Sequence, residues 1–422
     1  MKKWLIIGLL VGSLLVAAPL GYRPCQRARA RAWCATALEH QMNRDWPRME
    51  AAYRKAIAIQ PDCEDAWTFL AWHYAYNVSA EFDRIEDKYA KIRYAIEIGI
   101  ESVTKNPRSS QLQWNVGWTI FHRIGRAFES KEFRVLFARD EVLLDLLRQH
   151  VEVEPAFGPD GKIDSFLIAR AWFRKAAVTA DDFGRSEKLM SHVAFYLYSA
   201  HAQAAYAEAL GADGFSDEVV IRAWQDALRD LQEYGNREFT YSASRSVRLY
   251  DHETLVEQQK ALVAAKNSNQ QNGSKDLKQT RELEEKLYWT TRYRLMINFD
   301  YWLERCRYEP TQPWLATRRM MFEARQHAAT ATDPSKKEVA RELFEQSFHA
   351  WSRLIAEHAF LQDDAVLGEE LVKYIALYQE TVLDGRPLPA DFPLRDAVAR
   401  WQSVAAELQA AESQLRIESR HK

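Results

Sequence analysis

A glutamate and two histidines near the C-terminal end have side chains suited to metal chemistry. Glu345 and His349 are spaced by one helical turn, and His358 follows in the same segment. Carboxylate and imidazole groups at this spacing can bind a zinc ion. The same spacing also recurs on any charged helix, and no further ligand pattern accompanies it. We therefore interpret these residues as part of a solvated helix face and predict no metal site.

Patterns that carry catalysis are also missing from the sequence. Asp160 and Asp164 surround Gly161, but the terminal glutamate of a calcium loop is absent. No glycine-rich phosphate loop, GxSxG, HExxH or CxxC motif occurs. The four cysteines are Cys25, Cys34, Cys63 and Cys306. Their spacing is not that of a metal site, and they are compatible with either a reducing or an oxidising compartment. We predict no enzyme and no cofactor; the alternative is an envelope enzyme with an unrecognised active site.

Composition favours a helical chain. The 422 residues are 47% hydrophobic, and glycine and proline are scarce at 15 and 13. Stretches rich in Ala, Leu, Glu, Arg and Lys favour helix, and no long alternation of β-branched residues predicts a strand. We therefore expect an all-α fold without a sheet. The formal charge of -2 gives no reason to predict a nucleic-acid partner.

The N-terminal segment predicts a membrane anchor. An uncharged apolar run extends from Trp4 to Leu20. At about 1.5 Å per residue, a helix of this length nearly matches the hydrocarbon core of a bilayer. Two lysines precede the run, and four arginines follow it: Arg23, Arg27, Arg29 and Arg31. We predict a single transmembrane helix, and a cleaved signal peptide is the alternative.

The charges beside this segment bear on its orientation. The arginine cluster places the body of the protein in the cytoplasm by the positive-inside rule. A short basic N-terminus is, however, also typical of exported proteins. We expect a single-pass protein of the bacterial inner (plasma) membrane with a cytoplasmic body, and an extracytoplasmic body remains the alternative.

A 34-residue pattern organises the segment after the anchor. Bulky, small, aromatic, small and proline residues occupy positions 4, 8, 24, 27 and 32 of the first copy, namely Trp33, Ala37, Tyr53, Ala56 and Pro61. The next copy repeats positions 4, 7, 8 and 11 with Trp67, Leu70, Ala71 and Tyr74. Over about residues 30–121, the sequence resembles the tetratricopeptide-repeat family, in its membrane-anchored bacterial form. The resemblance implies stacked pairs of antiparallel helices.

Later parts of the chain keep this pattern in degenerate form. A third first helix, residues 109–121, has Gly117 at position 8, and three later segments retain only the second-helix signature: Ala169/Phe173/Ala176, Val220/Trp224/Ala227 and Ala340/Phe344/Ser347. We predict an all-α, degenerate tetratricopeptide-like superhelix with an N-terminal transmembrane helix and a long helical hairpin. Its parts are an anchor (1–22), repeats (23–126), degenerate helical pairs (127–250), the hairpin (251–310, flexible tip 267–274) and a C-terminal pair with terminal helices (311–422). The aromatic segment that returns from the tip, residues 288–309, is expected to be buried.

The resemblance also implies where a partner would bind. First helices of such repeats line a concave surface, where family members that hold carboxylate tails place Lys and Asn. Here this cationic clamp is missing, and the corresponding positions carry Trp72, Tyr76, Trp114, Trp118 and Phe121. Either a peptide or membrane-protein helix docks on this aromatic floor, or a later helix of the chain covers it. We expect a scaffold or adaptor that binds unidentified proteins and, through residues 4–20, the lipid bilayer.

Overall fold

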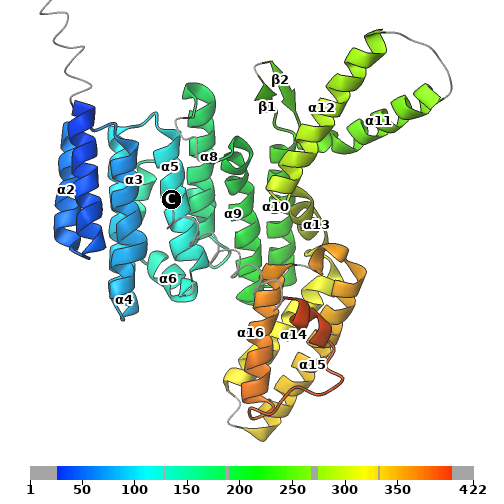
Figure 1. Ribbon diagram of the computed structural model, residues 1–422. Helices are drawn as coiled ribbons and strands as arrows, with labels where there is room; N and C mark the ends of the chain where they lie inside the picture. Colours follow the sequence, from blue (N-terminus) through cyan, green and yellow to red (C-terminus); the bar gives the residue numbers. More distant parts are fainter. Residues whose placement is uncertain are drawn as a thin grey trace, which may run out of the picture. The chain divides into compact units, whose positions relative to one another are not determined.

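The computed structural model describes residues 26–401, except for 128, 186–189, 243, 268–273, 331–332 and 363. Helices dominate this part of the chain, so the all-α prediction is confirmed. The chain divides into two compact units between Gln203 and Ala204 (Figure 1). Among the described helices, none combines the length and the apolar character that crossing a bilayer requires. The predicted anchor, Trp4 to Leu20, lies outside the described residues.

The N-terminal unit is built from helices that follow one another with short connections. A helix over residues 26–42 carries Arg27, Arg29 and Arg31, all exposed. The elements after it are α2 (Trp46–Ile59), α3 (Glu64–Trp72), η1 (His73–Val78), η2 (Ser79–Glu81), α4 (Ile85–Lys105), α5 (Ser110–Thr119), η3 (Ile120–Arg126), α6 (Ser130–Phe137), α7 (Glu141–Arg148), η4 (Glu154–Ala156), α8 (Ser165–Phe183) and α9 (His192–Ala212), which crosses the division.

Local sequence explains where these helices begin and end. Asp45 accepts a hydrogen bond from the backbone N–H of Arg48 at the start of α2, and Ser109 and Asp164 cap α5 and α8 in the same way. Such caps satisfy N–H groups that have no partner within the helix. At the other end, α2 stops at Ile59, two residues before Pro61, as predicted.

Close packing in this unit follows from small residues at the helix contacts. Along the chain, α3 packs on α4 and α4 on α5, whereas α5 packs along α8 with α6 and α7 inserted between them in sequence. Gly117 makes the last contact possible, because a Cβ there would lie 3.0 Å from the ring of Phe173 and 3.2 Å from Trp172. The helix that packs along α5 thus lies beyond residue 126, where the predicted repeat segment ends.

The C-terminal unit contains α10 (Asp217–Gly235), β1 (Phe239–Ser242), β2 (Arg245–Val247), η5 (Leu249–Asp251), α11 (His252–Asn267), α12 (Ser274–Met296), α13 (Phe299–Tyr308), α14 (Gln312–Ala329), α15 (Pro334–Glu357), η6 (Ala359–Leu361), α16 (Ala365–Thr381) and a helix over 395–401. Strands β1 and β2 form an antiparallel hairpin in which Phe239 pairs with Val247. The prediction of no sheet is therefore wrong. Strands this short give too few residues for a visible alternation.

Two long helices flank the segment predicted to be a hairpin tip. Helix α11 ends at Asn267, α12 begins at Ser274, and the two helices contact each other. The root of α12 is fixed by Arg294, which donates a 2.6 Å hydrogen bond to the carbonyl oxygen of Leu249. Burial of the aromatic segment is only partly confirmed. Phe299 is fully buried, but Tyr288 and Leu295 are 55% and 74% exposed.

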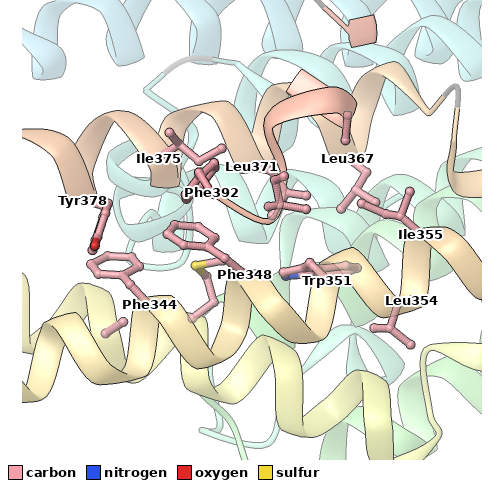
Figure 2. Close-up of a cluster of buried hydrophobic side chains, with 14 of the residues drawn as sticks. Phe344, Phe348, Trp351, Leu354, Ile355, Leu367, Leu371, Ile375, Tyr378 and Phe392 are labelled. Carbon is pink, nitrogen blue, oxygen red and sulfur yellow. The ribbon is translucent and has the colours of Figure 1, made fainter. Parts of the chain in front are cut away.

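Helices α14, α15 and α16 enclose the apolar core shown in Figure 2. Phe344 and Phe348 of α15 stack at 5.7 Å between ring centroids, and the ring of Tyr378 from α16 stands edge-on to both. Trp401 covers Gly368, where a Cβ would approach the indole to 2.5 Å. The signature residues Ala340, Phe344 and Ser347 are each completely buried, as a packing role requires.

Candidate partner-binding site

Both first helices that carry the predicted aromatic floor end in a π-helical turn. Helix α3 continues as η1 and α5 as η3, so each gains a turn with i→i+5 hydrogen bonding. Directly after η1, the Ser79 hydroxyl donates a 2.7 Å bond to the Ala75 carbonyl, and within η1 Asn77 Nδ2 lies 2.9 Å from His73 Nδ1. Such π-helical turns are rare, and they occur frequently at functional sites.

A half-buried arginine joins the two π-helical turns. Arg123 of η3 donates from Nε to the Ala75 carbonyl oxygen over 2.8 Å and from Nη2 to the Ser79 hydroxyl over 3.2 Å. Its guanidinium carbon lies 5.3 Å from the ring centroid of Tyr76, within cation–π range. Burial lowers the pKa of Arg123, yet an arginine in a protein keeps its charge. The contact therefore fixes η1 against η3 and holds Tyr76 in place.

Aromatic rings run in a continuous row across the two turns. Trp72 stacks on Tyr76 with centroids 4.2 Å apart, and the Tyr76 hydroxyl lies 3.0 Å from His122 Nδ1. His122 stacks on Trp118 at 4.9 Å, and Trp118 stacks on Trp114 at 5.4 Å with an interplanar angle of 9°. Burial and the neighbouring Arg123 lower the pKa of His122, so the imidazole is neutral at pH 7. We call these five rings the aromatic row.

One end of the aromatic row is covered by the chain itself. Tyr198 of α9 stands edge-on to Trp114 at 5.0 Å, to Trp118 at 5.4 Å and to Phe121 at 6.0 Å. Phe173 of α8 adds a further ring 5.5 Å from Trp114. Consequently Trp114 and Phe121 are only 5% and 8% exposed. They act as core residues, as the covered alternative expects.

The other end of the row faces solvent. Trp72 is 45% exposed, although it stacks on Tyr76, and Tyr76 and Trp118 are half-buried between the two ends. Phe69, on the preceding turn of α3, is 46% exposed and stacks on His73 at 6.4 Å. The structure thus brings the five predicted residues into one cluster, and of these five only Trp72 is classed as exposed. Sequence reasoning missed Phe69, although its position one turn before Trp72 was a usable signal.

Sequence reasoning also missed the residues that orient this cluster. His122, Arg123 and Tyr198 contact it from η3 and α9. His122 and Arg123 follow Trp118 by four and five residues and belong to the π-helical turn η3. Tyr198 is a distant residue, and no pattern in the sequence links it to the row.

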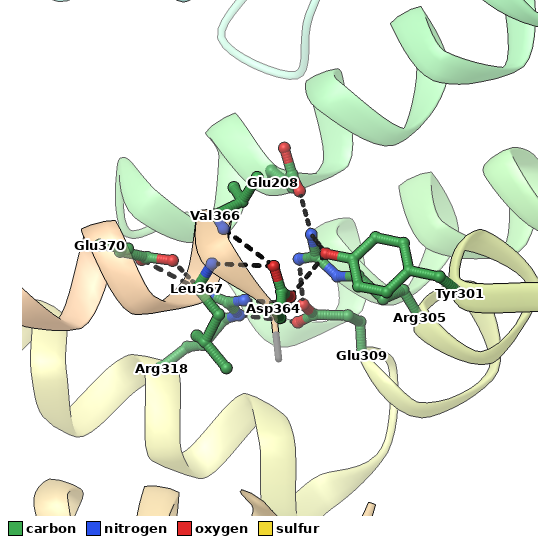
Figure 3. A network of polar contacts seen from close by, with 9 residues as sticks. All are labelled: Glu208, Tyr301, Arg305, Glu309, Arg318, Asp364, Val366, Leu367 and Glu370. Atoms are coloured by element: carbon green, nitrogen blue, oxygen red, sulfur yellow. Dashed lines mark hydrogen bonds and ion pairs between the residues drawn. The ribbon is translucent and has the colours of Figure 1, made fainter. Parts of the chain in front are cut away.

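A buried charge network forms the second notable site, within the C-terminal unit (Figure 3). Glu309 is completely buried and accepts hydrogen bonds from Arg305 and from Arg318, the latter through both of its oxygens at 2.7 Å. Arg305 also donates to Glu208 over 2.5 Å, and Arg318 to Glu370 over 3.2 Å. Burial alone would raise the pKa of Glu309, but the two guanidinium groups outweigh it and lower that pKa.

The network borders a cavity of about 360 Å³. The lining includes apolar and charged side chains, among them Glu208, Asp217, Trp224, Glu309, Arg318 and Phe322. Glu309 keeps both oxygens directed at guanidinium groups, and its lowered pKa keeps it ionised, so the geometry suits an ion pair that fastens α13 to α14. A general base would instead need an oxygen directed at a substrate proton.

The residues considered for metal binding make other contacts. Glu345 accepts a 2.8 Å hydrogen bond from the Tyr378 hydroxyl, and His358 packs on Tyr308 with ring centroids 4.2 Å apart. Asp164 caps α8, while Asp160 pairs with Lys162. Across the described residues, no three His, Cys, Asp or Glu side chains gather closely enough to hold a metal ion.

Comparison with known proteins gives no relative. No protein-family model matches the sequence, and no curated protein or solved structure matches it. The functional interpretation therefore depends on the geometry above.

Proposed function

We propose that this protein is a membrane-anchored, tetratricopeptide-like adaptor that binds a partner protein at the exposed end of the aromatic row. The observation that carries the proposal is Trp72, a large aromatic side chain held open to solvent on a rigid base. Tyr76 supports its face, and His122 and Arg123 fix Tyr76 in turn. A pre-oriented tryptophan loses little conformational entropy on binding, which is why such residues anchor protein interfaces.

The repeat architecture in this proposal is supported by contacts at the pattern positions. Gly117, at position 8 of the third copy, packs against Phe173, the aromatic of a second-helix signature. Ala37, Tyr53 and Ala56 of the first copy are completely buried. Small residues opposite aromatic ones let antiparallel helices approach closely, as the tetratricopeptide resemblance implies.

The membrane part of the proposal is supported by sequence. The apolar run from Trp4 to Leu20 would confine the helical body to the surface of the bacterial inner membrane, and the arginines after it favour a cytoplasmic body. Confinement raises the effective concentration of the adaptor toward membrane-bound partners. An exported protein released by signal cleavage is the competing arrangement, and the mass of the mature N-terminus distinguishes the two.

Photocrosslinking in intact cells tests the partner-binding role. A photoreactive phenylalanine replaces Trp72 in one variant and Phe183, a 57% exposed aromatic of α8, in a matched control. We expect a discrete crosslinked protein from position 72 that is absent from position 183. Identical crosslinks from both positions, or none from position 72, would refute the proposal.

A further variant keeps the result interpretable. Trp72→Ala removes an exposed ring, so it should lower the free energy of unfolding by no more than about 1 kcal/mol and still abolish co-purification of the crosslinked partner. Trp114 is unsuitable for this purpose, because its 5% exposure makes its replacement a test of the core.

A further inference from the structure

A second cavity lies in the N-terminal unit, between α8 and the segment that follows α7. Its volume is about 580 Å³, within the range of about 300–1,000 Å³ that is typical of small-molecule sites. One wall consists of residues 150–156, which include η4, and the other is a face of α8. η4 packs on α8, and the backbone N–H of Asp164 donates a 2.8 Å hydrogen bond to the Ala156 carbonyl oxygen. The wall opposite α8 is therefore held in place by backbone contacts.

One face of α8 supplies both apolar and cationic side chains to this cavity. Its lining residues recur at positions i, i+3, i+4, i+7, i+8 and i+11, which share one side of a helix: Leu167, Arg170, Ala171, Arg174, Lys175 and Val178. Across the cavity, Val151, Pro155 and Ala156 add apolar surface. The lining thus suits a ligand that has an apolar body and a charged group.

The charges around the cavity are mostly positive. Arg170, Arg174 and Lys175 line it, and Glu152 is the one carboxylate among its described lining residues. Burial and the nearby Lys175 lower the pKa of His150, so this imidazole is neutral at pH 7. The whole chain has a formal charge of -2, so the excess of cations is a local feature. A cavity with this balance of charge attracts an anion.

Lys175 is a half-buried cation that has no carboxylate partner among the described residues. Its ammonium group donates a 2.6 Å hydrogen bond to the His150 carbonyl oxygen and lies 5.5 Å from the ring centroid of the buried Trp172. These contacts fix the ammonium group and use one of its three N–H donors in a hydrogen bond. Burial lowers the pKa of Lys175, and no described carboxylate opposes this effect. An anion in the cavity would supply the missing opposite charge.

We propose that this cavity binds a small organic anion, in which a phosphate or carboxylate group carries a short apolar chain. The anionic group lies against the Lys175 ammonium and the arginines of the same helix face, because charge-assisted hydrogen bonds from such groups are strong. The apolar chain lies along Leu167, Ala171 and Val178. The cavity contains no residue of the aromatic row, so this proposal does not depend on the adaptor proposal.

Isothermal titration calorimetry of the purified full-length chain with octyl phosphate tests the proposal. We expect saturable binding of octyl phosphate. Octanol lacks the charge and inorganic phosphate lacks the apolar chain, so each should bind at least about tenfold more weakly. Octanol that binds as tightly as octyl phosphate, inorganic phosphate that does so, or no binding of octyl phosphate would overturn the proposal.

A competition experiment distinguishes two sources of such an anion. Phosphatidylglycerol vesicles should displace octyl phosphate more strongly than phosphatidylcholine vesicles if the natural ligand is a lipid. Without this difference, the ligand is a soluble molecule. Both results agree with an anion-binding cavity, and they differ only in where the anion comes from.

Two pairs of variants locate the binding in this cavity. Val178→Glu places a negative charge at a lining residue that is 60% exposed, and its matched control is Val142→Glu, at a 61% exposed valine of α7 outside the lining. We expect Val178→Glu to weaken binding of octyl phosphate at least about tenfold and Val142→Glu less than about twofold. Lys175→Met and its control Lys373→Met, at an exposed lysine of α16, should show the same contrast. Circular dichroism confirms that each variant is folded, and equal affinities of Val178→Glu and Val142→Glu would contradict the assigned site.

Discussion

Replacing Glu309 by glutamine tests whether the buried charge network holds the C-terminal unit together. Glu309 has no exposed surface, and Arg305 and Arg318 have only 5% and 19% of their side chains exposed. Glutamine keeps one acceptor oxygen but removes the charge that faces two guanidinium groups. Arg305 then retains Glu208, and Arg318 retains Glu370, as their remaining anionic partners in the network.

The size of the effect follows from these contacts. One ion pair at about 4 Å and an effective dielectric constant of about 20 is worth about 4 kcal/mol, and Glu309 makes two. The variant no longer has to desolvate a buried carboxylate, and this gain offsets part of the sum. We therefore expect the free energy of unfolding to fall by about 3–5 kcal/mol, the range for removing one member of a buried pair. The matched control is Glu369→Gln, whose partner Lys373 is exposed, with an expected change within about 0.5 kcal/mol.

Hydrogen exchange measured peptide by peptide is the suitable assay, because two compact units need not unfold together. A loss of about 3 kcal/mol raises the exchange of globally protected amides in α13 and α14 more than about a hundredfold, while α2 to α4 keep their protection. If Glu309→Gln changes exchange no more than Glu369→Gln does, the network contributes little, and the reasoning from burial and charge is wrong.

Two further predictions concern the free energy of unfolding. Gly214→Ala places a Cβ 2.3 Å from the Phe322 ring at a residue with φ +81°, so it should lower the free energy of unfolding by about 2–4 kcal/mol. The control Gly385→Ala has φ +76° and open space around the new Cβ, so it should lower that free energy by about 1 kcal/mol. Equal losses for the two variants in urea unfolding would refute the steric clash. Burial lowers the pKa of His73 to about 4, below the unfolded value near 6.5, so the free energy of unfolding should be constant above pH 6.5 and fall by about 3 kcal/mol toward pH 4. His73→Gln should flatten this dependence, and an unchanged slope would show that other groups cause it.

The helical part of the fold could be predicted because its signals are local. Pro61 and the residues around it predict the end of α2, and the spacing of Ala340, Phe344 and Ser347 places them on one buried face of α15. Ser216, a residue type that favours helix N-termini, occupies the N-cap position of α10, although its side chain makes no capping hydrogen bond. Helical periodicity and helix-terminating residues are visible within a few neighbouring positions, so the sequence alone is enough to predict them.

The arrangement of the sites could not be predicted, because its determinants are distant in the chain. Tyr198 buries Trp114 from more than a helix away, and the network joins Glu208 to Glu309 through Arg305. Arg305 and Glu309 are one helical turn apart, but this spacing is common on exposed helices. Tertiary packing decides which Arg–Glu pairs at this spacing become buried. That packing cannot be recognised from a single sequence.

The two π-helical turns also determine how the first helices can differ in length between related proteins. A π turn is an α turn with one residue inserted, so deletion of a residue within η1 or η3 would restore a regular helix without disturbing either flank. The same deletion elsewhere in α3 or α5 would rotate all following side chains by about 100°. A homologue that lacks the inserted residue would keep its helices. It would lose the hydrogen bond from Arg123 to the Ala75 carbonyl and the contact between the Tyr76 hydroxyl and His122. A one-residue gap at these positions in an alignment would therefore separate homologues that have the aromatic row from those that do not.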